Sequence, residues 1–169
     1  ETFDDPSSAQ SKAVEWLREV DIFTEMSNAT RLVERYALAV FYFSMDGPNW
    51  QGQDKWMDPR EEICTWGGIT CNSNASVVSF ALGGKGKGDV EFTAKGLIPS
   101  ELNALADLET VAFIDQQVEG IAGPLYGVKS LELIKSIQAI PTAIFEMTNL
   151  ETLDLSDNNM EESIPSELG

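Results

Sequence analysis

The sequence predicts an α/β solenoid: a right-handed superhelix with short parallel strands on its concave side, preceded by a helical N-terminal cap. Apolar residues recur with a fixed spacing that ends in a polar residue, most completely at Leu150, Leu153, Leu155 and Asn158. Weaker copies of this pattern come earlier in the chain. An amphipathic segment and loops rich in tryptophan precede them all, as expected for a lid over the first of several stacked repeats.

Four strand segments are expected, beginning at residues 77, 108, 131 and 150, so that successive starts are 31, 23 and 19 residues apart. The segment 108–118 follows the pattern with Val, Phe and Gln as replacements. The segment 131–139 keeps only the first two apolar positions, with Ser136 and Ala139 where Leu and Asn are expected. Repeats of this kind usually span about 20–29 residues. We therefore expect an insertion in the first repeat and a shortened third repeat.

A proline recurs in the second half of each repeat, at Pro99, Pro124, Pro141 and Pro165. Proline fixes one backbone angle and is well tolerated in the first turn of a helix. The segments 99–106 and 141–147 are therefore expected to form helices of one or two turns on the convex side. The run 83–88, rich in glycine and lysine, lacks the ending and the setting of a phosphate-binding loop and is interpreted as a flexible insertion.

The residues before the first repeat are predicted to form a helical cap. Residues 30–44 carry apolar side chains at helical spacing, which predicts an amphipathic helix with a broad apolar face. Trp50, Trp56 and Trp66 lie among loop-forming residues, and we interpret them as core filling rather than as ligand-stacking groups. A second helix around Trp16 and Leu17 is expected to pack on the cap helix, with a docking arm as the alternative.

Several of these segments carry a resemblance to a known family. The phrase Ile-Pro-Ser-Glu-Leu at 164–168 resembles plant-type extracellular leucine-rich repeat proteins. The upstream segments 35–44, 47–50 and 64–71, together with Trp56, look like the N-terminal cap that precedes such repeats. Such proteins include receptor-like kinase ectodomains and inhibitors of cell-wall pectinases. The helix before the cap is similar to secreted or cell-surface leucine-rich repeat proteins of diatoms and related algae. The resemblance implies an extracellular location, either secreted or as a cell-surface ectodomain.

The resemblance divides the chain into three parts. Residues 1–27 form a helical extension, 28–76 a cap that contains a disulfide, and 77–169 about four repeats. The disulfide that the family pattern implies joins Cys64 to Cys71, and an even pair around a tight loop favours the same interpretation. Such a bridge indicates an oxidising compartment. A metal site is the alternative, but the chain has no histidine and no further cysteine to complete a ligand set.

Two sequons, Asn28-Ala-Thr and Asn74-Ala-Ser, are candidate N-glycosylation sites. Both lie beside expected ends of helices or strands, where a glycan can point into solvent. Together with the implied export, they predict a glycoprotein.

Composition fits one soluble, acidic unit. The chain has 169 residues, 43% of them apolar, which is enough for a continuous stacked core. Its net charge of −17 repels phosphates, so nucleic acids and anionic membranes are not expected as partners. No run of 18 apolar residues occurs, and the first residues are polar. Because the sequence stops inside a repeat, we expect it to be part of a longer protein.

Enzyme chemistry finds little support in the residues. Without histidine there is no Ser-His or Cys-His relay, and carboxylate pairs on the edge of a repeat are expected to be solvated. We therefore predict no enzyme activity, no metal and no cofactor.

Ligand recognition is the function class that remains. The residues between the buried positions of each strand point outward from the concave sheet, where they can contact a ligand. The first strand would present Ser79 and Ala81. Candidate ligand-face residues on the other strands are Thr110, Ala112, Ile114, Leu133, Lys135, Ile137, Thr152, Asp154 and Ser156. Ile114, Leu133 and Ile137 would form an apolar contact patch, unless they pack against a neighbouring segment.

The leading functional hypothesis is an extracellular, non-catalytic module that recognises a protein, peptide or glycan. The alternative is a structural or adhesive scaffold glycoprotein of a cell wall, a matrix or a larger complex. Assembly into a larger complex or an oligomer is a further candidate among the partners.

Overall fold

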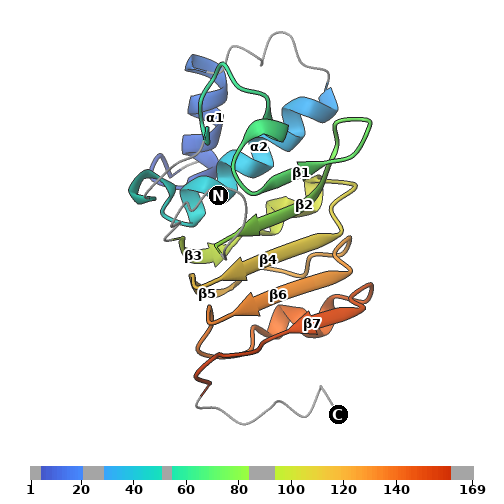
Figure 1. Cartoon of the computed structure of the whole chain (residues 1–169). Helices are drawn as coiled ribbons and strands as arrows, with labels where there is room; N and C mark the ends of the chain where they lie inside the picture. Colours follow the sequence, from blue (N-terminus) through green and yellow to red (C-terminus); the bar gives the residue numbers. More distant parts are fainter. Residues whose placement is uncertain (1–4, 21–28, 51–54, 84–93, 161–169) are drawn as a thin grey trace.

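The computed structural model describes residues 5–20, 29–50, 55–83 and 94–160. Helices α1 (Ala9–Glu19) and α2 (Ala29–Ser44) lie at one end of a five-stranded sheet (Figure 1). The strands of this sheet are β1 (Ile69–Cys71), β2 (Val77–Leu82), β4 (Thr110–Ile114), β6 (Ser130–Ile134) and β7 (Thr152–Asp154). A second sheet has the strands β3 (Lys95–Ile98) and β5 (Gln117–Ile121). Short 3-10 helices are η1 (Gly47–Asn49), η2 (Ile63–Thr65), η3 (Ser100–Ala104) and η4 (Thr142–Glu146).

The large sheet is mixed, which corrects the expectation of parallel strands alone. Its order is β1-β2-β4-β6-β7, and the last four strands are parallel, but β1 runs antiparallel to β2. The cause is the short connection 72–76, because a tight turn can join only antiparallel strands. The Asn72 side-chain oxygen fixes this turn by accepting hydrogen bonds from the backbone N–H groups of Asn74 and Ser76.

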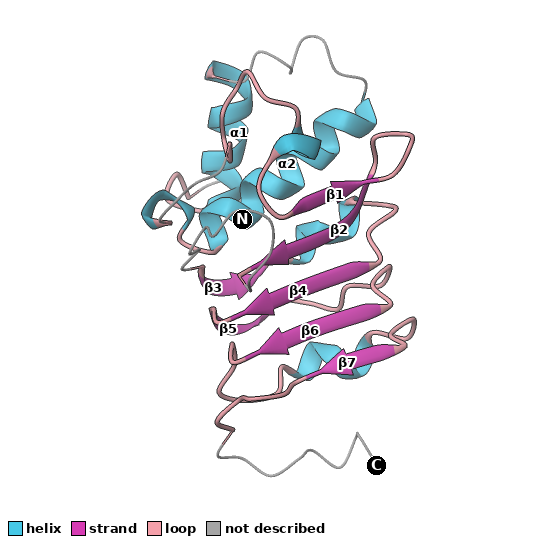
Figure 2. Ribbon diagram, viewed as in Figure 1, coloured by secondary structure: helices cyan, strands magenta, loops and turns pink. Residues whose placement is uncertain are grey.

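The return path of each repeat runs behind the large sheet. Helices η3 and η4 appear behind the strands in Figure 2, and each follows a proline, Pro99 or Pro141, as the sequence predicts. The parallel strands β3 and β5 lie on the same return path. The apolar side chains of strands and returns therefore enclose one core, in which Val111, Phe113 and Leu131 are fully buried.

The third repeat begins at Val128 rather than at Leu131, so its predicted register is wrong. Leu131 pairs with Val111 and Leu133 with Phe113, and Val128, Leu131 and Leu133 are all buried. The starts are thus 77, 108, 128 and 150, which makes the spacings 31, 20 and 22 residues. Only the first repeat is long, and the third is not shortened. Because the shift of three residues is odd, it exchanges the inward and outward faces of the strand.

A ladder of polar side chains, of which Gln116 and Ser136 are buried, follows the strand ends. In this ladder, Gln116, Ser136 and Asn158 occupy equivalent positions in three successive repeats. Ser136 Oγ accepts a hydrogen bond from the backbone N–H of Gln116 and donates to backbone carbonyl oxygens. Asn158 Oδ1 accepts from the N–H groups of Ser136 and Ile137. The ladder satisfies backbone groups that leave the sheet at the turn, where burial without a partner is costly.

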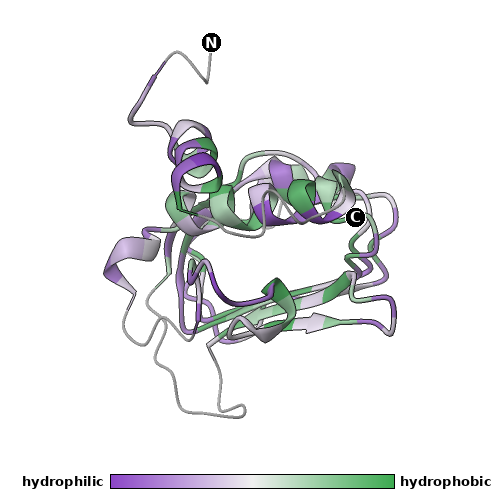
Figure 3. Ribbon diagram, turned by 90° about the horizontal axis from the view of Figure 1, so that it is seen from above, coloured by the Kyte–Doolittle hydropathy of each residue, from purple (hydrophilic) through white to green (hydrophobic). Residues whose placement is uncertain are grey.

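Helix α2 packs against the first repeat through an aromatic column. Its Phe41 lies edge-on to Phe80 of β2, with ring centroids 4.5 Å apart, and Phe80 in turn lies 5.6 Å from Phe113 of β4. Trp50 and Trp56 flank Phe41, and both are buried, as predicted for core filling. Seen along the stack, the strands lie on one side of the molecule and α2 on the other (Figure 3). These rings fill the end of the core.

Helix α1 packs on this assembly around a buried arginine. The guanidinium of Arg35 lies 5.3 Å from the Trp16 ring centroid and 5.4 Å from that of Trp66, and its Nη1 donates to the carbonyl oxygen of Glu61. Trp16 and Trp66 also contact each other edge-on. Trp16 and Leu17 are buried, so α1 packs on the cap helix as predicted, and the docking-arm alternative is not needed.

Candidate functional site

The outward face of the large sheet is the candidate site. Along β4, Val111 and Phe113 point into the core, so that Thr110, Ala112 and Ile114 point away from it. The same alternation on the other strands defines a surface, here named the outward sheet face. It comprises Ser79, Ala81, Thr110, Ala112, Ile114, Ser130, Glu132, Ile134, Thr152 and Asp154.

The strand register arranges the outward sheet face in three rows. The first row is hydroxylic: Ser79, Thr110, Ser130 and Thr152 are successive partners across four strands. The second row runs Ala81, Ala112, Glu132 and Asp154, so it changes from small and apolar to acidic. The third row pairs Ile114 with Ile134. Neighbouring strands are about 4.8 Å apart, so each row offers closely spaced groups to one ligand.

Three predicted face residues lie elsewhere. Leu133 is fully buried and points inward, and Ile137 is buried behind the turn that follows β6. Lys135 is exposed, but it occupies that turn in a left-handed conformation, with φ of 49°, rather than the strand. The predicted patch of Ile114, Leu133 and Ile137 therefore does not form. The apolar pair on the outward sheet face is instead Ile114 and Ile134. The predicted register had placed Ile134 on the inward side.

The remaining predicted residues lie where they were expected. Thr110, Ala112 and Ile114 are on the outward side of β4, although the small Ala112 is only 6% exposed. Thr152 and Asp154 are on β7, and Ser156 is exposed just after that strand. The residues that the sequence reasoning missed are Ser130, Glu132 and Ile134. The signal was present, because Val128, Leu131, Leu133 and Ser136 fit the repeat pattern better than a start at Leu131.

The acidic end of the second row consists of Glu132 and Asp154. Hydrogen bonds from the hydroxyl and backbone N–H of Ser156 lower the pKa of Asp154. Its partner in the row, Glu132, is half-buried on the adjacent strand. No ion pair in the described part of the chain involves either carboxylate. Both charges are therefore available to a ligand.

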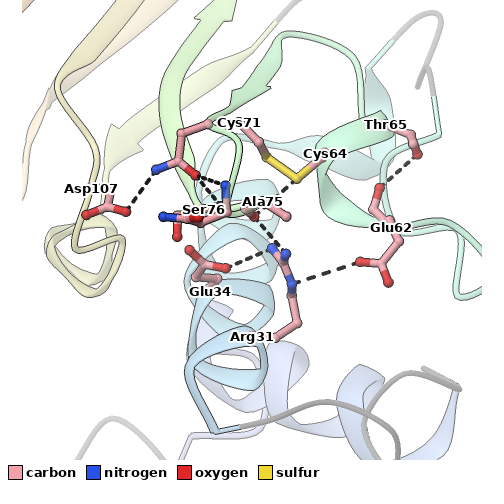
Figure 4. The surroundings of a disulfide bond; sticks show 11 residues. Arg31, Glu34, Glu62, Cys64, Thr65, Cys71, Ala75, Ser76 and Asp107 are labelled. Carbon is pink, nitrogen blue, oxygen red and sulfur yellow. Dashed lines mark hydrogen bonds and ion pairs between the residues drawn. A yellow bond between two sulfur atoms is a disulfide. The ribbon is translucent and has the colours of Figure 1, made fainter.

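The cysteine loop lies beside the first strands. Cys64 and Cys71 form a disulfide in the structure, with their Cα atoms 5.7 Å apart. Figure 4 shows the neighbouring ion pairs of Arg31 of α2, with Glu34 at 2.8 Å and Glu62 at 3.9 Å. Arg31 also donates to the carbonyl oxygen of Ala75, in the turn between β1 and β2. These contacts tie α2 to the loop and to the edge of the sheet.

The two sequons differ in what the structure shows. Asn74 is exposed in the turn between β1 and β2. Asn28 lies outside the described residues, as do most of the glycine- and lysine-rich run and the last repeat segment from residue 161. Among the described residues, no group of three or more acidic, cysteine or histidine side chains is placed to hold a metal ion. None of the described helices is long and apolar enough to span a membrane.

Sequence comparison relates the chain to plant receptors. It is 29% identical over 119 residues to phytosulfokine receptor 1 of Arabidopsis thaliana, an alignment that covers 68% of this chain and 9% of the receptor. It is 31% identical over 108 residues to a probable leucine-rich repeat receptor-like serine/threonine-protein kinase, RPK1, of the same plant, covering 60% of this chain and 18% of that protein. The chain thus spans less than a fifth of these relatives. No family model matches it.

Solved structures share the fold. The receptor kinase HAESA of Arabidopsis, in a complex with the peptide hormone IDA and the co-receptor SERK1, matches with a TM-score of 0.61 and 24% identity. That match covers 84% of this chain and 23% of the other. A leucine-rich repeat protein from Bacteroides thetaiotaomicron matches with a TM-score of 0.57 and 12% identity, covering 84% of this chain and 30% of that one.

Proposed function

We propose that this chain, a plant-type leucine-rich repeat protein, is a non-catalytic recognition module that binds a protein or peptide ligand on its outward sheet face. The sequence relatives are named as receptors, and one structural neighbour was solved with a peptide hormone. Both observations support recognition as the role of the fold, while the ligand of this chain is part of the proposal.

The observation that carries the proposal is the arrangement of the three rows. Hydroxyls, carboxylates and an aliphatic pair lie side by side on one rigid sheet, and most of them are at least partly exposed. Polar groups of this kind fix the orientation of a ligand, while buried apolar contacts supply much of the affinity. Ile114 and Ile134 are the candidate apolar anchor, and the hydroxyl row offers both donors and acceptors.

The charge of the chain favours ligands that are not acidic. A net charge of −17 attracts basic partners and speeds their association, most strongly at low salt. Glu132 and Asp154 lie within the proposed contact surface, so a basic side chain of the ligand would find carboxylates there.

A peptide-display selection tests the proposal. Peptides selected on the folded chain are expected to lose at least tenfold in affinity when Ile134 is replaced by Asp. The matched control is Leu97→Asp, because Leu97 is also apolar and is 48% exposed, but it belongs to the second sheet. Circular dichroism shows whether both variants fold. If both bind as the parent chain does, or if no peptide is selected, the scaffold role becomes the better account.

Export and cap organisation are part of the same proposal. The disulfide supports an oxidising compartment, and the exposure of Asn74 supports a glycan at that sequon. We also propose that the chain divides at residues 27 and 76 and that α1 and α2 cap the repeats. The same proposal includes a right-handed superhelix and a similarity to algal leucine-rich repeat proteins. The intact mass of the natively produced protein, before and after glycosidase, tests export and glycosylation together.

A further inference from the structure

A groove separate from the outward sheet face runs along the edge where the parallel strands end. It has a volume of about 670 Å³ and lies between the turns that follow β4, β6 and β7 and the start of β5. This volume is within the range of about 300–1,000 Å³ that is usual for small-molecule sites. The outward sheet face and the groove share no residue, so the groove needs an explanation of its own.

The floor of the groove is fixed in place. Gln116 and Ser136 line it, and both are at least 95% buried. Gln116 Oε1 accepts from the backbone N–H of Ala94, and Gln116 Nε2 donates to the carbonyl oxygen of Ile114. The apolar side chains of Val118 and Ile137 lie beside these polar groups. Because its polar groups are already paired and its apolar side chains are buried, the floor gives the groove its shape rather than hydrogen bonds to a ligand.

The rim offers hydrogen bonds. Gln117, Gln138 and Asn159 are exposed carboxamides on three different segments. Each carboxamide carries two N–H donors and an acceptor oxygen, which match the paired donor and acceptor character of neighbouring hydroxyls. No hydrogen bond of the described part of the chain uses these three side chains. They are therefore available to a polyhydroxylated ligand.

The charges of the groove decide which polyhydroxylated ligand fits. Lys95 and Lys135 on the rim are balanced by Glu119 and Asp157, so these four residues sum to zero, whereas the chain as a whole carries −17. An acidic saccharide or a phosphorylated ligand would meet the repulsion of the whole chain without a local excess of positive charge. A cationic ligand would gain little from a balanced rim. A neutral ligand is not repelled by the net charge of the chain, and it does not need an excess of charge on the rim.

We propose that this groove binds a neutral saccharide, with the carboxamide rim engaging its hydroxyls and the exposed side chain of Ala139 contacting its C–H face. The site is independent of the proposed peptide-binding surface. It would let one chain contact a protein ligand and a neutral glycan at the same time.

Nuclear magnetic resonance titration tests the proposal on the intact, disulfide-bonded chain labelled with nitrogen-15. The probes are the hexamers of β-1,4-glucose, β-1,4-xylose, β-1,4-mannose and α-1,4-glucose, with the α-1,4-galacturonic acid hexamer as the charged comparison. At least one neutral hexamer is expected to shift the side-chain N–H₂ signals of Gln117 and Gln138. Its affinity is expected to change less than twofold between low and physiological salt, because no charge is neutralised.

Matched variants locate the site. Gln138→Ala combined with Asn159→Ala is expected to weaken binding at least tenfold. Asn74→Ala, which removes an exposed carboxamide from the opposite edge of the sheet, is expected to leave it unchanged. The proposal is overturned if none of the neutral hexamers binds at 10 mM (roughly the weakest range of specific binding), if only the galacturonic acid hexamer binds, or if both variants weaken binding equally. None of these outcomes affects the test of the outward sheet face, because that test measures peptide binding.

Discussion

Replacing Ser136 by Ala removes the middle rung of the polar ladder. Ser136 Oγ accepts a hydrogen bond of 3.1 Å from the backbone N–H of Gln116. It also lies 2.9 Å from the carbonyl oxygen of Phe113 and 2.7 Å from that of Ile134. Alanine fits the space but replaces none of these contacts, so that the N–H of Gln116 is left buried without its partner.

The expected loss of unfolding free energy follows from these bonds. An orphaned buried donor costs about 1–3 kcal/mol, and a lost hydrogen bond to a carbonyl oxygen about 0.5–1.5 kcal/mol more. The apolar methyl group of alanine offsets part of this cost. The free energy of unfolding is therefore expected to fall by about 2–3 kcal/mol, which for a chain of this size lowers Tm by about 4–12 °C.

Urea unfolding measures the loss, with the midpoint expected to fall while the slope stays constant. Ser73→Ala is the control, because Ser73 is exposed in the turn between β1 and β2 and its replacement is expected to change stability by less than about 0.5 kcal/mol. A loss at Ser136 no larger than that of the control would refute the reasoning that the ladder satisfies buried backbone groups.

Three further predictions concern the N-terminal region. Replacing Cys64 and Cys71 by Ser opens a loop of sequence separation 7 and is expected to cost about 2–3 kcal/mol in urea unfolding; an unchanged midpoint would contradict this. Hydrogen bonds from the Arg60 side chain and backbone lower the pKa of Asp58 to about 2, so carbon-13 NMR should show its carboxylate titrating near pH 2, and closer to the ordinary value of 3.8 in Arg60→Ala. Burial raises the pKa of Glu34 above 4.5, so its ionisation opposes folding at neutral pH, and this cost disappears as pH falls through the raised pKa toward 4.5. Relative to Glu34→Gln, the parent chain should therefore gain stability on acidification over that window, and a difference that does not vary with pH would exclude a raised pKa.

The sequence predicts the repeat architecture well because the inward positions follow a strict spacing. Leu153 pairs with Leu131, and the amphipathic helix is found at Ala29–Ser44, within one residue of its predicted start. The tryptophans at 50, 56 and 66 are core residues because their large rings fill the end of the core beside α2 and β2. Helix α2 and the burial of these rings can therefore be predicted from the sequence pattern.

The outward sheet face was harder to predict, because it depends on register. In the third repeat Leu131, Leu133 and Ile134 are all apolar, so composition alone does not tell which of them point inward. The spacing from Val128 favours Leu131 and Leu133 as the inward residues, and their pairing with Val111 and Phe113 shows it. The groove beside Gln116 also arises from contacts between distant segments, for which no local pattern gives a signal. The antiparallel strand β1 depends instead on the local turn 72–76, which the repeat pattern does not describe.

The crystal structure of the chain with a selected peptide tests the central claim most directly. The claim predicts that the peptide lies on the outward sheet face, with an apolar side chain against Ile114 and Ile134 and polar contacts to Glu132 or Asp154. A peptide bound to the convex side, around η3 and η4, or to the α1–α2 pair would contradict it.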